Sequence, residues 1–126
     1  MKLRINGNSI RLRLLRSEVE KLGATGAVSE AVRFGPNGSD TFQYTLSISY
    51  DADSISARFA ANEMIVLVPA NITYNWTKGD AVSLAAEQRI DENEPLTILI
   101  EKDFVCLDRP EDPDNADAFP RPNTNC

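Results

Sequence analysis

Five cations close to the start of the chain are the residues best suited to chemistry. Lys2 and Arg4 alternate with apolar residues on one expected strand, and Arg11 and Arg13 do the same on the next. Residues two apart on a strand point to the same face, so each strand presents a pair of cations. Together with Arg16, they predict a site for an anionic ligand or an acidic protein partner.

Two other interpretations fit the same five cations. An outer face of alternating charge often only keeps a hairpin in solution. The cations could also pair with the chain's own acids, because residues 1–33 have a charge balance of +4 and residues 34–126 one of −10. The net charge of −6 argues against indiscriminate binding to nucleic acid, so a nucleic-acid partner is not favoured.

The sequence shows no recognisable set of catalytic or metal-binding residues, although Lys, Asp and Glu support some chemistry, so an enzyme stays the less favoured alternative. The chain has no histidine to act as a base near neutral pH. Cys106 and Cys126 cannot complete a tetrahedral zinc site by themselves. The acidic run at 112–117 lacks the central glycine and the bidentate glutamate of a calcium loop. We therefore predict a non-catalytic binding module without metal or cofactor.

Alternating hydrophobicity and turn residues predict a chain made mostly of strands. The expected strands are 2–5, 10–14, 27–34, 41–50, 55–59, 64–68, 81–88 and 96–100. Ser17 is expected to cap a short first helix that Gly23 ends, and Asn71 to cap a second helix. Residues 103–126 differ in composition, being rich in proline and acidic residues.

The order of elements in the first half of the chain repeats itself in the second. In an ungapped alignment of the two halves, Ile10 falls on Met64, Ser17 falls on Asn71, and the tripeptide at 27–29 falls on an identical one at 81–83. Coincidence among alternating strands is the alternative explanation. The pattern predicts two ββαββ repeats, 1–50 and 55–102, that form a single domain over 1–102. The expected fold is a mostly β, pseudo-two-fold closed barrel, since neither repeat can bury its sheet alone.

The segment IVLVPANITYNWTKGDAVSLAAEQ, residues 65–88, resembles the swapped-hairpin barrel domain of AbrB-type regulators and antitoxins. An apolar strand ending at Pro69, a helix with Ile72 and Trp76, and a Gly-Asp turn at 79–80 carry this resemblance. It implies that two copies interlock as a fused dimer, with a double-psi barrel as the alternative topology. The first copy matches more loosely, because Leu15 replaces the proline.

The AbrB resemblance also implies DNA binding, which we keep as the alternative function. The helix positions that would face DNA, Thr73 and Tyr74 or Val19 and Glu20, lack the arginines of that family. The chain as a whole, particularly ILIEKDFVCLDRP at 98–110 and DAFPRP at 117–122, resembles a group of short bacterial proteins of unknown function. That second resemblance implies no activity.

Apolar residues in two other segments predict how the molecule is covered. Phe104, Leu107 and Phe119 should dock residues 103–126, the C-terminal arm, onto the barrel. The strand Met64–Val68 is apolar on both faces, so the arm or a second subunit should cover it, giving a monomer or a homodimer. No apolar run reaches membrane-spanning length and the start lacks a signal-peptide pattern, so we expect no membrane partner and a cytoplasmic location.

Overall fold

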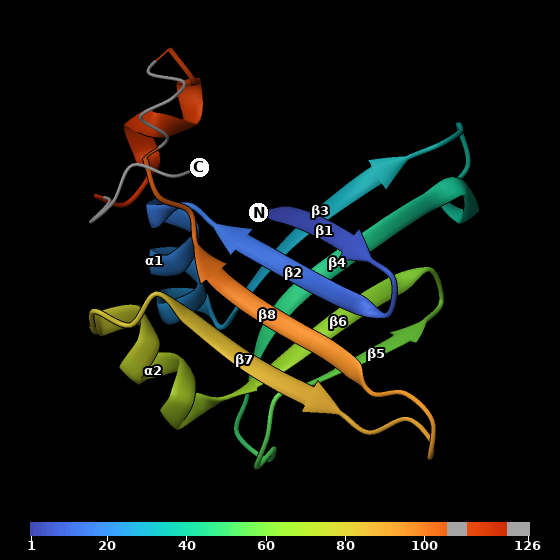
Figure 1. Cartoon of the computed structure of the whole chain (residues 1–126). Helices are drawn as coiled ribbons and strands as arrows, with labels where there is room; N and C mark the ends of the chain where they lie inside the picture. Colours follow the sequence, from blue (N-terminus) through green and yellow to red (C-terminus); the bar gives the residue numbers. More distant parts are fainter. Residues whose placement is uncertain (106–110, 121–126) are drawn as a thin grey trace.

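The computed structural model describes residues 1–105 and 111–120 and is mostly β. Figure 1 shows the strands in two layers, with both α-helices at one end of them. The elements are β1 (Lys2–Asn6), β2 (Ser9–Leu14), α1 (Arg16–Thr25), β3 (Ala27–Arg33), η1 (Gly38–Asp40), β4 (Thr41–Ser49), β5 (Ser56–Ala60), β6 (Glu63–Pro69), α2 (Ala70–Lys78), β7 (Ser83–Gln88), β8 (Leu96–Lys102) and η2 (Pro113–Asp117).

Each layer is a four-stranded sheet that combines one hairpin from each half of the chain. Sheet A has the order β1-β2-β8-β7, and sheet B has the order β3-β4-β6-β5. The two central pairs, β2–β8 and β4–β6, are parallel, whereas the outer pairs are antiparallel. Neither half therefore forms a sheet without the other.

The strand registers follow the ungapped alignment of the two halves except at β7. Val28 on β3 pairs with Leu46 on β4, while Leu84 on β7 pairs with Ile100 on β8. The alignment places Leu46 on Ile100, but it places Val28 on Val82 instead of Leu84. The expected strand start at 81 and the ungapped match of the two tripeptides are therefore wrong. Two additional residues after α2 delay the start of β7 to Ser83.

The helix ends also differ from the sequence expectation. α1 begins at Arg16, directly after Leu15, because the Glu18 carboxylate accepts the Leu15 backbone N–H at 2.8 Å. The helix continues past Gly23 and ends at Thr25, and the next residue, Gly26, has a φ of 90° that suits only glycine. α2 begins immediately after Pro69, so Asn71 lies inside the helix instead of capping it.

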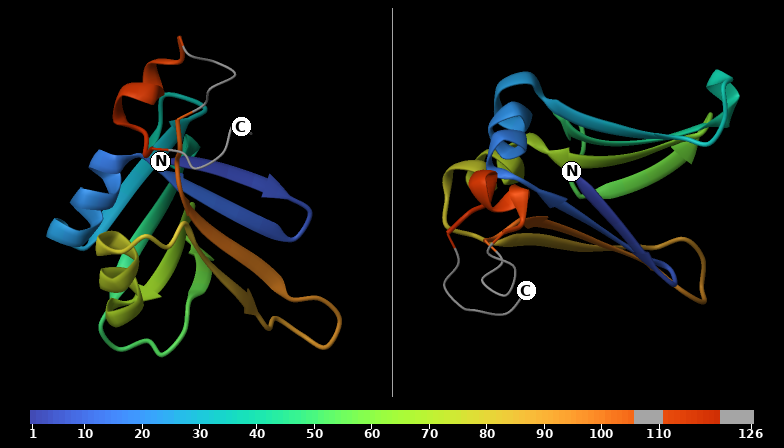
Figure 2. Two further views of the ribbon diagram at one scale, coloured as in Figure 1. Left: turned by 60° about the vertical axis from the view of Figure 1, so that its left-hand side comes forward. Right: turned by 90° about the horizontal axis from the view of Figure 1, so that it is seen from above.

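The core lies between the inner faces of the two sheets and the two helices. Its fully buried members include Leu12, Leu46, Val66, Trp76 and Ile100. The sheets approach one another beside the helices and diverge away from them (Figure 2). Within the described ranges no strand pairing joins sheet A to sheet B, so the predicted closed barrel is not found.

The strand Met64–Val68, which was expected to need a cover, lies inside sheet B. It forms most of β6, whose two edges pair with β4 and β5, so it cannot join a second copy by strand pairing. Its outward residues Ile65 and Leu67 are half-buried. A homodimer through the outer face of β6 stays a prediction.

In residues 1–105 and 111–120, no helix is long and apolar enough to cross a membrane.

Candidate functional site

The basic hairpin brings four of the five predicted cations to one face of sheet A. Lys2 lies opposite Arg13, and Arg4 lies opposite Arg11 across the β1–β2 pair. Directly opposed residues point to the same face of a sheet. We call this set of four residues the basic face. Arg16, the fifth cation, lies at the first position of α1.

Acidic groups from the C-terminal part of the chain neutralise most of the basic face. Arg11 Nε lies 3.1 Å and Arg13 Nε 3.4 Å from the same oxygen of Glu101 on β8. Lys2 Nζ lies 2.9 Å from a carboxylate oxygen of Asp103 and 2.9 Å from one of Asp114. Of the interpretations that the sequence left open, this geometry favours pairing with the chain's own acids.

The environment of Lys2 holds this residue in its charged form. Partial burial lowers the pKa of Lys2, but hydrogen bonds to Asp103 and Asp114, and their charges, outweigh burial and raise the pKa above its ordinary value. Because the folded-state pKa is raised, this contribution to stability is complete below the unfolded-state value and is lost as pH rises through the folded-state value. Lys2 is therefore charged at neutral pH, where its ion pairs with Asp103 and Asp114 join β1 to the arm.

The C-terminal arm also holds Arg16 and the start of α1. The Arg16 guanidinium lies 5.6 Å from the centroid of the Phe119 ring, and its Nη2 donates to the Ala118 carbonyl at 3.4 Å. The Asp117 carboxylate accepts the backbone N–H of Ser17 at 3.0 Å and also bonds its hydroxyl. An acid at the first turn of a helix is favourable. The acidic run at 112–117, which was compared with a calcium loop, forms η2, and its Asp117 makes these contacts with Ser17.

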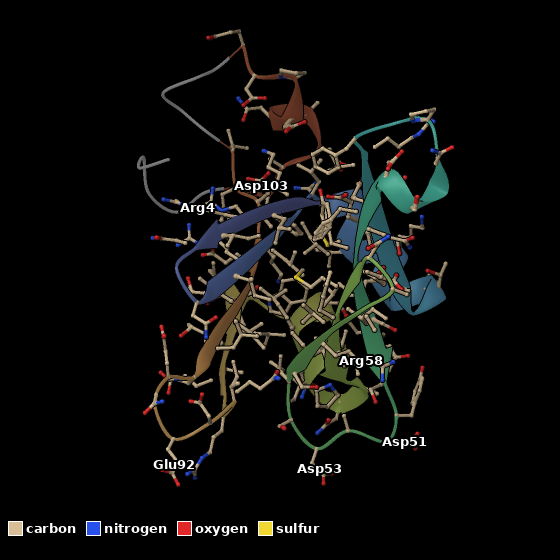
Figure 3. All side chains as sticks on the ribbon, turned by 90° about the vertical axis from the view of Figure 1, so that its right-hand side faces the viewer. Arg4, Asp51, Asp53, Arg58, Glu92 and Asp103 are labelled. Atoms are coloured by element: carbon tan, nitrogen blue, oxygen red, sulfur yellow. The ribbon has the colours of Figure 1, made fainter. Side chains whose placement is uncertain are left out.

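Arg4 is the member of the basic face that keeps its charge available. In the part of the chain that the structure describes, Arg4 forms no ion pair or side-chain hydrogen bond. Its side chain is exposed and points away from the space between the two sheets (Figure 3). The five predicted residues therefore divide into four that hold the fold together and one free cation.

Reversing the charge of Arg11 and Arg13 tests this division. The double variant R11E/R13E places two new carboxylates beside that of Glu101, and we expect it to lower the free energy of unfolding by about 1–2 kcal/mol, allowing for partial exposure. At about 1 M salt the loss should shrink by half or more. Denaturant unfolding at low salt and at about 1 M salt measures the loss of stability under each condition. Arg4→Glu is the matched control and should change stability by less than about 0.5 kcal/mol, whereas equal effects of both changes would contradict the assignment.

A buried cation that the sequence pattern did not reveal lies behind the arm. Lys102 is buried, its Nζ lies 5.5 Å from the ring centroids of both Trp76 and Phe119, and it donates to the Gly79 carbonyl at 2.8 Å. Burial lowers the pKa of Lys102, and the charge of Asp80 offsets this in part. Lys102 thus links the arm to α2 through both rings.

The open end of the molecule carries apolar side chains on the inner faces of the sheets. Three that face the other sheet by strand parity remain exposed to solvent, at 62%, 44% and 69% for Ile5, Val32 and Phe59. Phe34, which follows the last residue of β3, is 78% exposed. They are exposed because the sheets diverge there (Figure 2). We call this end of the molecule the mouth.

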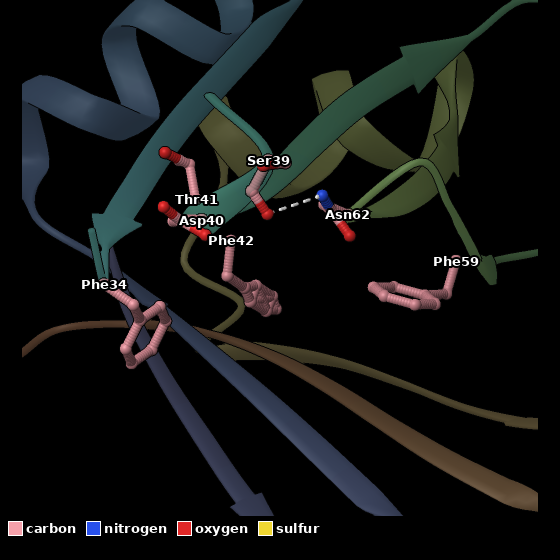
Figure 4. A pocket seen from close by; sticks show the side chains of 7 residues that line it. All are labelled: Phe34, Ser39, Asp40, Thr41, Phe42, Phe59 and Asn62. Carbon is pink, nitrogen blue, oxygen red and sulfur yellow. Dashed lines mark hydrogen bonds between the residues drawn. The ribbon is translucent and has the colours of Figure 1, made fainter. Parts of the chain in front are cut away.

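A pocket of about 240 Å³ lies on the sheet B side of the mouth. Figure 4 shows the ring of Phe42 between those of Phe34 and Phe59, with polar side chains beside them. The Phe42 and Phe59 rings meet edge to face at 6.3 Å. The Asn62 side chain donates to the Ser39 carbonyl at 3.2 Å and so joins the β5–β6 turn to the loop before β4. The lining residues are Phe34, Ser39, Asp40, Thr41, Phe42, Phe59 and Asn62.

The sequence analysis missed this pocket. Alternation correctly placed Phe42 on the core side of its strand, but it gives no information on how closely the opposite sheet approaches. The loop GPNGSD at 35–40 was the available signal, since it separates two strands that both carry an aromatic residue at the same end.

The described residues contain no cluster of potential metal ligands. No set of three or more Asp or Glu side chains among residues 1–105 and 111–120 gathers as metal ligands would. Cys106, Leu107 and Cys126, singled out in the sequence, lie outside the described residues.

Comparisons with known proteins give a family but no function. No curated protein and no solved structure matches the chain. The resemblance to AbrB-type domains is not shown by these comparisons and stays a prediction. A family model described as "Family of unknown function (DUF7009)" matches residues 1–123. The chain therefore belongs to this family of unknown function.

Proposed function

We propose that this protein is a non-catalytic module that binds another protein, and that the partner inserts an apolar side chain at the mouth. The observation that carries the proposal is the exposure of Ile5, Val32 and Phe59 on sheet faces that pack inward elsewhere in the molecule, together with the exposed ring of Phe34. Exposed apolar patches rimmed by polar groups are typical of interaction sites.

The size of the pocket favours a protein partner over a free organic ligand. Pockets for drug-sized ligands range from about 300 to 1,000 Å³. A volume of about 240 Å³ is below this range and suits one large side chain. Polar rim groups such as Asp40 and Asn62 add hydrogen-bonding capacity around the aromatic centre.

The geometry of the basic face disfavours the two anionic alternatives. A small anion or DNA could pair only with Arg4 on the basic face, because Lys2, Arg11 and Arg13 already pair with Glu101 and the arm among the described residues. A DNA-binding regulator needs several free phosphate contacts, whose affinity falls steeply with salt. Retardation of duplex DNA at about 50 mM salt would revive that alternative.

An NMR titration with N-acetyl-phenylalaninamide tests the proposal. This probe carries one aromatic side chain between two amides, and a ligand of this size should bind with a Kd of about 1–10 mM. Amide shifts should concentrate in residues 34–42 and 59–62. Phe59→Ser should weaken binding about tenfold, the equivalent of one lost apolar contact.

Val82→Ser is the matched control, since Val82 is exposed at 42% in the loop before β7. It should leave the affinity unchanged. Saturating shifts elsewhere on the molecule, or equal binding by the Phe59→Ser variant, would refute the mouth as the binding site.

A further inference from the structure

The hairpins β1–β2 and β5–β6, each of which places its first strand at a sheet edge, have the same register but a different environment. In β5–β6 the strands close at Ala60 and Glu63 around a two-residue turn, and Ala57 lies opposite Val66. In β1–β2 they close at Asn6 and Ser9, and Leu3 lies opposite Leu12. Opposed pairs alternate between bonded and non-bonded in an antiparallel ladder, so Leu3 and Ala57 have the same orientation.

Gln88 reveals that orientation at Ala57. Its carboxamide Oε1 accepts the Ala57 N–H at 2.6 Å, and its Nε2 donates to the Ala57 carbonyl at 2.9 Å. Both backbone groups of Ala57 therefore face away from β6. One side-chain amide makes here the two bonds that the backbone of an added strand would make.

The equivalent position beside β1 cannot provide this amide. Gln88 lies opposite Leu96, whereas Phe42, the counterpart of Leu96 in the first half of the chain, lies opposite Val32. Valine has no hydrogen-bonding group and cannot bond the backbone of β1. By the alternation of the ladder, the N–H and C=O of Leu3 and of Ile5 face the free side of β1. No hydrogen bond to them from outside the hairpin occurs in residues 1–105 and 111–120.

We infer that the free edge of β1 accepts an extended segment of a protein partner by strand addition. The inference rests on the proposed function and names the partner's form. β1 and β3 diverge toward the mouth (Figure 2), which leaves the edge of β1 open where Ile5 is exposed. Backbone hydrogen bonds to Leu3 and Ile5 hold the segment, as in other cases of β-augmentation.

The side chains on either face of β1 define the chemistry of the segment. Alternate residues of an added strand point to opposite faces. Those on the inner side lie beside Ile5 and must be apolar, whereas those on the outer side lie beside Arg4, the free cation of the basic face. The segment therefore alternates apolar with acidic residues, since opposite charges on neighbouring strands attract.

Calorimetry with the full chain and a synthetic peptide tests the inference. The probe is an acetylated and amidated heptapeptide, Glu-Val-Glu-Phe-Glu-Val-Glu, and its lysine counterpart is the charge control. The glutamate peptide should bind with a Kd below about 1 mM and at least tenfold more tightly than the lysine peptide. Methylating peptide nitrogens of one parity should abolish binding, whereas methylating the other parity should leave it, since one edge of an added strand pairs with β1.

Variants of β1 give the second measurement. Ile5→Pro removes an N–H that the hairpin does not use, and it should raise the Kd of the glutamate peptide at least tenfold. Ile5→Val keeps the N–H, and its Kd should stay within threefold of the wild-type value. Strand addition is overturned if the two sets of alternate N-methylations have equal effects on binding, or if the glutamate peptide does not bind. If N-acetyl-phenylalaninamide still binds at Phe59, the proposed function survives that failure. If the protein does not bind the peptide but forms a dimer that the Ile5→Pro change dissociates, the occupant of the β1 edge is a second copy of this chain. That result overturns the inference of a partner segment.

Discussion

Replacing Trp76 by alanine should lower the free energy of unfolding by about 3–5 kcal/mol, the largest single-residue effect that we expect. The Trp76 side chain is 1% exposed and lies on the face of α2 that packs into the core. Its Nε1 donates to the Val82 carbonyl at 3.3 Å, and its ring faces the ammonium of Lys102. The variant loses packing, a hydrogen bond and the cation–π contact together. Domains of this size are stable by about 5–15 kcal/mol, so a partly unfolded population at 37 °C is expected.

Chemical denaturation followed by circular dichroism measures the loss. Asn75→Ala, an exposed change on the same helix, is the control for helix propensity and should stay within about 0.5 kcal/mol of the wild type. A loss below about 1 kcal/mol for Trp76→Ala would show that α2 does not close the end of the core.

Deleting residues 103–126 should have the second-largest effect, a loss of about 2–4 kcal/mol. Phe119 packs against the core, Asp117 binds the start of α1, and Asp103 and Asp114 pair with Lys2. Burial of one aromatic ring and one helix cap account for most of this figure. For a chain of 126 residues, the melting temperature should fall by roughly 8–15 °C.

Two single changes separate the parts of this effect. Phe119→Ala should reproduce about half of the loss, while Phe34→Ala, which removes an exposed ring at the mouth, should leave the melting temperature within about 2 °C. An unchanged melting temperature in the deleted chain would mean that the arm contributes nothing to the fold.

Local patterns were sufficient for most of the strands. The alternation at 41–50 predicted β4 to within one residue, and the Asn6-Gly7 signal predicted the first hairpin, in which Gly7 has a φ of 57°. These features depend on neighbours in sequence. The late start of β7 was missed because the additional residues resemble the strand that they precede.

The binding surfaces depend on contacts that no local pattern encodes. The basic face was grouped correctly, but its partners Glu101, Asp103 and Asp114 lie at the opposite end of the sequence. Lys102 reads as an ordinary residue at a strand end. The role of Gln88 emerges only when both hairpins are compared, because its partner Ala57 belongs to the other sheet.

Hydrogen exchange of three backbone amides in the free, full-length protein tests the central claim most directly. Ala57 and Leu3 occupy the same position in their hairpins, and Gln88 bonds only the first of them. We expect the Ala57 amide to exchange at least about tenfold more slowly than the amides of Leu3 and Ile5, the equivalent of one hydrogen bond. Gln88→Ala should bring Ala57 to the same fast rate. Equal protection of all three amides in the wild type would mean that the edge of β1 is already occupied and would contradict the account.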